Sequence, residues 1–255
     1  MFMQKEFKPT DHQIPSITIG DSFALKRNIS NPDISSNSFY KEFKGLISSQ
    51  KVVTSIDLPL DSLYSRVFKR TVDILLSAII ILFVLSWLIP ILAILIKLDS
   101  KGPVFFLQKR NKKNAETFTC IKFRSMIVNA EADRLPACDD DKRITPLGRF
   151  LRTHYLDELP QFFNVLWGDM SIIGPRPHMI SDNMKYEELL DYYSYRYKVK
   201  PGITGLAQVL GCVGSTEDIE KMRDRISLDI FYIRHWSAIL DTKIIYRTAR
   251  KIAGL

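Results

Sequence analysis

Residues 154–177 read HYLDELPQFFNVLWGDMSIIGPRP and combine a helical apolar pattern with an acidic pair and a proline-framed arginine. The apolar residues recur at spacings of three and four, as on one buried face of a helix, at Leu159, Phe162, Phe163 and Leu166. Pro160 falls in the first turn, where a missing N–H breaks no hydrogen bond. The pattern predicts a helix that begins near Asp157, with Asp157 as its N-cap, and stops at Gly168.

Asp157 and Glu158 form the acidic pair at the predicted start of this helix. The helix dipole favours ionised carboxylates at that end and also favours a phosphate group bound beside them. Two ionised carboxylates beside a phosphate attract a divalent cation. A plain N-cap with an acidic neighbour is the alternative interpretation, because capping preference alone produces such pairs.

A second polar motif, Gly174-Pro175-Arg176-Pro177, follows the predicted helix. The prolines hold the arginine in a rigid turn, and a guanidinium is the forked donor best suited to phosphate. The whole pattern, D-E-L-P-Q-x-x-N-V-x-x-G-D-M-S-x-x-G-P-R-P, resembles the signature of the bacterial sugar transferases. These are the monotopic phosphoglycosyl transferases of the undecaprenyl-phosphate hexose-1-phosphate transferase type, which initiate exopolysaccharide or O-antigen synthesis.

The resemblance covers roughly Arg66 to the C-terminus. Its other elements are Lys69-Arg70, Lys97-Leu98-Asp99-Ser100, 102–106, 122–126, 200–205, Ala207-Gln208-Val209, and Asp229, Tyr232, Trp236, Ser237 and Asp241. We therefore predict three parts of the chain. Residues 1–65 form a loosely structured N-terminal extension with one short helix near 39–46, residues 66–101 form a membrane segment, and residues 102–255 form the catalytic domain.

Charge is distributed unevenly along the chain. The 255 residues include 36 Lys and Arg against 28 Asp and Glu, a net charge of +8. Residues 66–124 alone hold eleven Lys and Arg against three acidic residues, so this range carries the whole excess. The positive charge brackets an apolar segment, which favours an anionic membrane lipid surface as partner and argues against nucleic acid.

Residues 74–96 contain no charged side chain and are long enough, at about 1.5 Å per residue, to cross a hydrocarbon core of about 30 Å. A simple span is one interpretation. Cations lie on both sides of the run, however, so the positive-inside rule places both ends on the same side. Pro90 also frees the carbonyl of Ser86. These features predict a re-entrant helical hairpin that bends at Ser86 and Pro90, and the resemblance implies the same geometry.

The remaining chain predicts a mostly helical domain with a small β-hairpin. Residues 104–108 and 118–123 are short apolar runs on either side of a basic turn and are its expected strands. Residues 126–135 and 187–198 are expected to be helical, and the tyrosines of the second range suit either a membrane interface or the core. Amphipathic helices are expected after Asp218 and over 236–252. The predicted fold class is α/β, membrane-associated and monotopic.

The resemblance implies roles for the site residues. Asp157 would attack the β-phosphate of a UDP-sugar, Glu158 would assist, and both would hold Mg2+, with Mn2+ as the alternative ion. The implied substrate and phosphate contacts are Lys122, Arg152, Gly174, Pro175, Arg176, Pro177 and Gln208. The acceptor would be a polyprenyl phosphate, the transferred group a hexose-1-phosphate, and the location the cytoplasmic face of the bacterial inner membrane.

Two other classes of function account for parts of the sequence. A non-catalytic membrane-anchored scaffold would use the acidic pair only as a helix cap and the basic flanks only to bind lipid. A basic nucleic-acid binder is disfavoured, because the positive excess adjoins a membrane segment. The sequence leaves open whether the chain forms a homo-oligomer.

Overall fold

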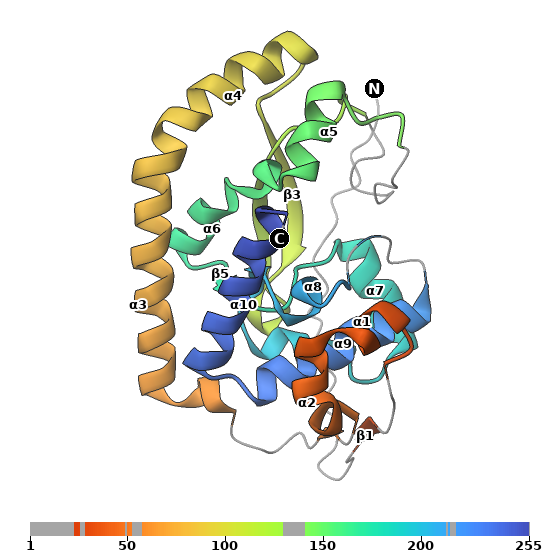
Figure 1. Ribbon diagram of the computed structural model, residues 1–255. Coiled ribbons are helices and arrows are strands. Elements are labelled where there is room, and N and C mark those ends of the chain that lie inside the picture. Colours follow the sequence, from red (N-terminus) through yellow and green to blue (C-terminus); the bar gives the residue numbers. More distant parts are fainter. Residues whose placement is uncertain are drawn as a thin grey trace, which may run out of the picture.

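The computed structural model describes residues 23–25, 29–48, 50–52, 58–129, 141–212, 214 and 218–254. Helices dominate this part of the chain (Figure 1): α1 Pro32–Ser36, α2 Ser38–Ser48, α3 Leu63–Ile80, α4 Ser86–Asp99, α5 Pro146–Thr153, α6 Gln161–Trp167, α7 Ile180–Leu189, α8 Leu206–Val209, α9 Ile219–Arg234 and α10 Ala238–Ile252. The predictions of a mostly helical domain and of two C-terminal helices are confirmed.

The strands form three two-stranded sheets. β1 (Phe23–Leu25) pairs antiparallel with β2 (Gln50–Val52), and β3 (Phe105–Asn111) pairs antiparallel with β4 (Thr117–Phe123), as the predicted hairpin requires. In this hairpin Phe106 lies opposite Lys122. β5 (Ser171–Ile173) and β6 (Gly202–Thr204) are parallel, and their three residues each are too short to give a sequence signal.

The apolar segment forms one long helix and not the predicted hairpin of two reversed arms. Helix α3, a π-helical turn (Ile81–Leu85) and α4 follow one another without interruption, and together they bow around the rest of the molecule (Figure 1). Ser86 Oγ donates to the carbonyl of Leu82 (2.6 Å), and Pro90 lies inside α4. The bend is therefore spread over several turns, because a π turn and a proline each loosen the helix without ending it.

Both ends of this long helix are attached to the same body. Near its start, Lys69 pairs with Asp241 of α10 (2.7 Å), and Arg70 donates to the last carbonyls of α6. Near its end, Leu92 and Ile96 are buried against β4 and α5. Arg124 Nη2 donates to the carbonyl of Ile96 (3.0 Å).

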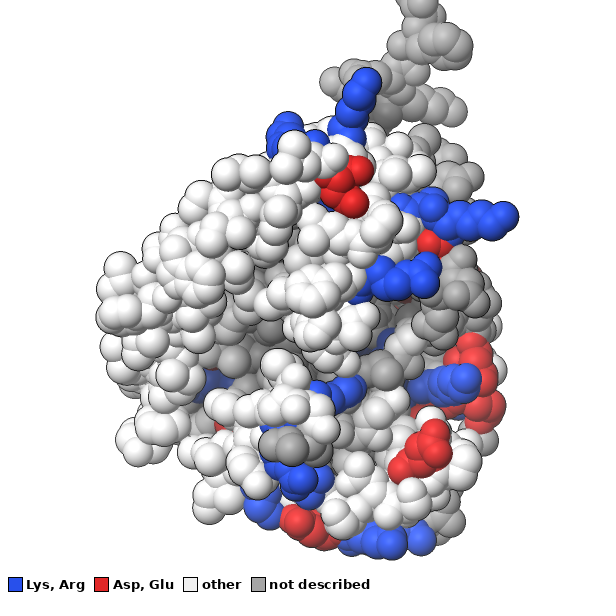
Figure 2. All heavy atoms as spheres, turned by 45° about the horizontal axis from the view of Figure 1, so that its top comes forward, with Lys and Arg blue, Asp and Glu red and all other residues white. Residues whose placement is uncertain are grey.

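The outward face of the long helix is apolar and open. By length and composition, residues 63–99 could cross a membrane, and only 17% of their most apolar window is buried. The large hydrophobic residues that are more than half exposed in this range are Leu63, Tyr64, Val67, Leu75, Ile79, Leu82, Phe83, Trp87, Ile94 and Leu98. Figure 2 shows this side of the molecule almost without charged side chains. Exposed apolar patches of this size mark surfaces that contact a protein partner or a membrane.

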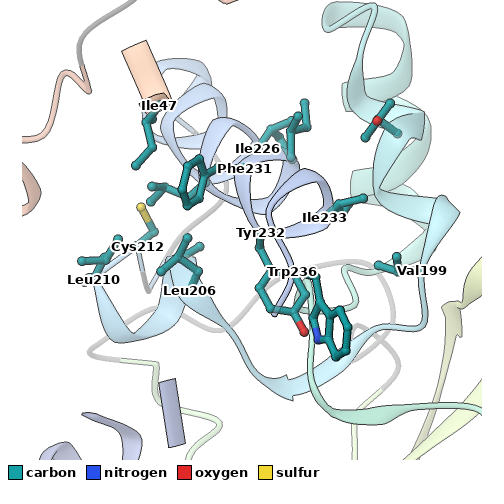
Figure 3. Close-up of a cluster of buried hydrophobic side chains, with 14 of the residues drawn as sticks. Ile47, Val199, Leu206, Leu210, Cys212, Ile226, Phe231, Tyr232, Ile233 and Trp236 are labelled. Carbon is teal, nitrogen blue, oxygen red and sulfur yellow. The ribbon is translucent and has the colours of Figure 1, made fainter. Parts of the chain in front are cut away.

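Helix α9 forms the centre of the main core. Ile226, Ile230, Phe231 and Ile233 are at most 1% exposed, and α8 and the 3₁₀ helix Tyr193–Lys198 pack around them (Figure 3). Residues 193, 195 and 197 are all buried tyrosines, so the core alternative for 187–198 is correct. Helix α7 ends at Leu189, and a 3₁₀ helix replaces the predicted continuation.

Residues 29–48 of the N-terminal extension pack onto α9 and α10. Helix α2 covers the range of the predicted short helix, and Ile34, Phe39 and Tyr40 are buried in the main core. Asp224 of α9 accepts hydrogen bonds from the N–H groups of residues 30 and 31 (2.9 and 3.0 Å). This part of the extension therefore shares one core with the catalytic domain.

Residues 126–129 do not begin the predicted helix. Met126 instead forms an isolated antiparallel bridge with Ile144. Residues 130–135, the remainder of that predicted helix, lie outside the described residues. Residues 126–129 instead extend the chain from β4 toward α5. The pairing of Met126 with Ile144 outweighs the local helix propensity of this range.

Candidate active site

The acidic pair lies in a short 3₁₀ helix (Leu156–Glu158) directly before α6. Tyr155 enters this turn with a φ of 57°, a left-handed conformation that bulky residues seldom adopt. The N–H of Glu158 then bonds to the carbonyl of Tyr155 (3.3 Å). The predicted N-cap role of Asp157 is therefore wrong, because the chain is already helical there and Pro160 occupies the cap of α6. The predicted stop at Gly168 is confirmed by its φ of 96°.

Glu158 is held by two cations from different elements. Lys122 of β4 places Nζ 2.7 Å from Oε1, and Arg176, after β5, places Nη1 2.8 Å from Oε2 and bonds Oε1 with its other nitrogen. Burial acts to raise the pKa of Glu158, but the charges of Arg176 and Lys122 outweigh it and hold that pKa below its usual range. Glu158 is therefore ionised at neutral pH.

Asp157 has a different environment from its neighbour. The residue is only 8% exposed, yet no hydrogen bond or ion pair holds its carboxylate within the described part of the chain. Burial raises the pKa of Asp157, Lys122 opposes this effect, and the charge of Glu158 adds to it. The pair thus consists of one fixed carboxylate and one that is available to react.

Arg152 lies near Asp157 without bonding to it. It occupies the last turn of α5, and its positive charge favours the ionised form of Asp157. Helix α5 is placed by a close backbone contact, since a Cβ on Gly148 would lie 1.9 Å from the carbonyl oxygen of Ser125. This contact brings α5 against the end of β4 and so brings Arg152 toward the acidic pair.

The Gly174-Pro175-Arg176-Pro177 loop is fixed by β6. The N–H of Gly174 bonds to the carbonyl of Thr204, and the carbonyl of Pro175 accepts from the N–H of Gly202, each at 2.9 Å. A Cβ on Gly174 would lie 2.6 Å from the carbonyl oxygen of Lys200, so only glycine fits this approach. Gly174 and Pro175 therefore position Arg176 through the backbone.

Two arginines that the sequence analysis did not single out hold the same loop. Arg196 pairs with Asp229 of α9 (2.9 Å) and donates through Nη2 to the carbonyl of Arg176. Arg110 of β3 donates to the carbonyl of Pro177 (2.9 Å). The sequence could have indicated Arg196, because it lies among alternating tyrosines at 193–197. A basic residue in a buried run needs an acidic partner, so its position predicts a buried ion pair.

Gln208 is the predicted site residue with the least support from the structure. It lies on α8, where its side-chain amide donates to the carbonyl of Ile203 (3.0 Å). The described contacts do not join it to the acidic pair, in contrast with Lys122 and Arg176. Its local role is to bind β6.

The acidic pair suits a divalent ion only in part. Among the described residues, no group of three or more His, Cys, Asp or Glu side chains could hold a metal. Mg2+ is often bound through one or two carboxylates, with substrate phosphate and water completing its octahedral shell, and Mn2+ accepts the same ligands. Asp157 would offer an open carboxylate to such an ion beside a bound phosphate, whereas both oxygens of Glu158 are bonded to cations and could hold the ion only after a cation leaves.

Fold and site together define a class of protein in which one open carboxylate, one fixed carboxylate and two cations lie in a mostly helical body that carries a long exposed apolar helix. Residues 64–254 match the family model of the bacterial sugar transferases, which is most of the chain. The chain belongs to this family, and the resemblance in its sequence predicted the family correctly.

The relatives carry related descriptions. The chain is 45% identical over 221 residues to UDP-glucose:undecaprenyl-phosphate glucose-1-phosphate transferase of Klebsiella pneumoniae (86% of this chain, 47% of the relative). It is 46% identical to the protein of that name from Escherichia coli (78% and 43%) and 44% identical to UDP-N-acetylgalactosamine-undecaprenyl-phosphate N-acetylgalactosaminephosphotransferase of Aeromonas hydrophila (72% and 43%). The chain thus spans less than half the length of these three relatives.

Proposed function

We propose that the chain transfers a sugar-1-phosphate from a UDP-sugar to undecaprenyl phosphate, the first membrane step of surface polysaccharide synthesis. The observation that supports this best is the contrast within the acidic pair. Among the described residues no hydrogen bond or ion pair holds the buried carboxylate of Asp157, while Glu158, Lys122 and Arg176 are already assembled beside it. Preorganised groups that face a site of developing charge are what phosphoryl transfer requires.

In the first step, a carboxylate oxygen of Asp157 attacks the β-phosphorus of the donor. The bond from this phosphorus to the bridging oxygen breaks, and UMP departs with the electron pair. Lys122 and Arg176 neutralise the charge that collects on the phosphate oxygens. Bound Mg2+, held by Asp157 and Glu158, would supply further neutralisation of the diphosphate.

In the second step, a phosphate oxygen of the acceptor attacks the same phosphorus. The bond to Asp157 breaks, the carboxylate is restored, and the product is an undecaprenyl diphosphate sugar. A nucleophile on the protein divides one difficult transfer into two easier ones. It also lets the soluble UMP leave before the lipid acceptor arrives.

The proposed location is the cytoplasmic face of the bacterial inner membrane, with the long helix inserted in one leaflet. The attachment of both helix ends to one body supports this, because a spanning helix separates its ends by the whole bilayer. Anionic lipids are the proposed partners of the cationic flanks. Cysteine labelling at positions 66 and 101 tests the topology, and labelling from opposite sides would establish a simple span.

The proposed donor carries a hexose. UDP-glucose is named for the Klebsiella relative and UDP-N-acetylgalactosamine for the Aeromonas relative, so both are candidate donors. Membranes that contain the chain are incubated with radiolabelled UDP-sugars and polyprenyl phosphate, and organic-soluble label is measured. A non-catalytic scaffold would produce no label with any donor.

A further inference from the structure

Arg176 and Glu158 form an ion pair that occupies the place where the proposed donor and metal would bind. Arg176 bonds both oxygens of Glu158, and Lys122 bonds Oε1 as well. A divalent ion needs oxygen ligands without such cations on them. In this arrangement Glu158 is therefore a poor metal ligand.

The charges of the site show why a metal ion alone would not bind well. The cations Lys122, Arg152 and Arg176 outnumber the carboxylates of Asp157 and Glu158, so a divalent ion alone would add two positive charges to a buried site that is already positive. The diphosphate of a nucleoside diphosphate sugar carries two negative charges and offsets the two positive charges that the metal brings.

Arg176 is the partner that can leave Glu158. Its side chain is 35% exposed, compared with 17% for Lys122 and 12% for Glu158. Its backbone is fixed by Arg196 and by the contact of Pro175 with β6, so only the side chain can move. A guanidinium also accepts phosphate in exchange for carboxylate with the same two-pronged geometry.

We propose that Arg176 couples donor binding to metal binding: its guanidinium moves from Glu158 to the donor diphosphate, and a divalent ion takes its place on Glu158. The proposal rests on the proposed function, because it assumes a nucleoside diphosphate donor. Such coupling is reciprocal, so the donor strengthens metal binding by the same factor by which the metal strengthens donor binding.

The test measures binding and not turnover. Mn2+ binding to the full chain in nanodiscs is followed by the electron paramagnetic resonance signal of free Mn2+, with and without UDP, which cannot react. For the wild type we expect UDP to tighten Mn2+ binding by a factor of about 5 to 150, the usual range of such couplings. Arg176→Ala should bind Mn2+ alone about tenfold more tightly than the wild type, because Glu158 is released, and UDP should add little.

Arg223→Ala is the matched control. Arg223 also pairs with a glutamate, Glu220, at 2.9 Å, and its side chain is 37% exposed, but the pair lies on α9. This variant should behave as the wild type does. It also corrects for Mn2+ that UDP binds in solution.

Two outcomes separate the coupling from the proposed function. If UDP binds but does not change the affinity for Mn2+, or if Arg176→Ala binds Mn2+ alone no better than the wild type, the coupling is refuted while the donor class stands. If UDP binds under no condition, the proposed donor and the coupling both fail. Equal melting temperatures of Arg176→Ala and Arg223→Ala show that the first variant is folded.

Discussion

Two arginine–carboxylate pairs meet at residue 176 and differ in burial. In the Arg196–Asp229 pair the side chains are 4% and 3% exposed, and Arg196 bonds the backbone of Arg176. In the Arg176–Glu158 pair they are 35% and 12% exposed. The first pair is sealed from solvent and fixes a loop, whereas the second reaches solvent and can exchange partners. The same chemical groups thus serve structure in one place and ligand binding in the other.

The largest expected effect tests the residue beside the exposed pair. Asp157→Asn should reduce transfer at least about 1000-fold, or about 4 kcal/mol, because the amide is no nucleophile. The melting temperature should stay close to that of the wild type, because the carboxylate has no described partner to lose. Radiolabel transfer and thermal unfolding are measured on the same preparation.

Mass spectrometry of protein quenched with donor alone sharpens this prediction. The wild type should carry a phospho-sugar on Asp157, and Asp157→Asn should carry none. Glu158→Gln should keep a slow first step. An adduct on Glu158 would instead indicate that Glu158 is the nucleophile. Wild-type protein that turns over without carrying any adduct would indicate direct transfer between the two phosphates.

The sealed pair should respond in stability. Asp229→Ala leaves Arg196 buried without its carboxylate partner, and we expect a loss of about 3 to 5 kcal/mol in the free energy of unfolding. Arg176→Ala should cost less than this, because Lys122 still pairs with Glu158 in that variant. Urea titration compares the two variants, and losses of equal size would remove the distinction between the pairs.

A smaller effect is expected from Arg176→Lys. The charge is kept, but the two-pronged contact is lost. The transition state should therefore lose about 1 to 3 kcal/mol of stabilisation, measured as a decrease in kcat/KM. Arg223→Lys on α9 serves as the control for the same change on the surface. Turnover at the wild-type level would assign Arg176 to the structure of the loop.

The pH dependence should separate the two carboxylates of the acidic pair. Burial raises the pKa of Asp157, and transfer requires its ionised form, so activity should fall about tenfold per pH unit once the pH drops below that raised pKa. The pKa of Glu158 is lowered, so its contribution to stability is complete above its usual pKa and is lost only as the pH falls through the lower, folded-state value. As the pH is lowered, activity should therefore disappear before the protein unfolds, with unfolding followed by circular dichroism. Loss of activity and of ellipticity at the same pH would contradict the opposite pKa shifts of Asp157 and Glu158.

The sequence predicted the parts that depend on short-range patterns. The spacing of apolar residues located α6, α9 and α10. The acidic pair and the proline-framed arginine marked Glu158 and Arg176, the family resemblance marked Lys122, and the structure brings these three together. Glycine at 168 marked the end of a helix. These features are local, so the residues themselves determine them.

The errors came from one unusual local conformation and from contacts between distant segments. The N-cap assigned to Asp157 failed because Tyr155 adopts a left-handed conformation that propensity does not favour. The helix expected after Met126 failed because that residue pairs with Ile144. Arg196 was missed because its partner Asp229 lies 33 residues away in the chain. No periodicity along one segment reports such pairings.

The bowed helix has a consequence for the choice of membrane. A spanning helix must match the thickness of the whole bilayer, and mismatch costs free energy for each ångström of difference. In the proposed insertion in one leaflet, the helix is tied at Lys69 and at Ile96 to one body, so its depth would be set by the protein and not by the opposite lipid surface. We therefore expect activity in nanodiscs to be nearly independent of acyl-chain length, which would let one chain work unchanged in membranes of different thickness.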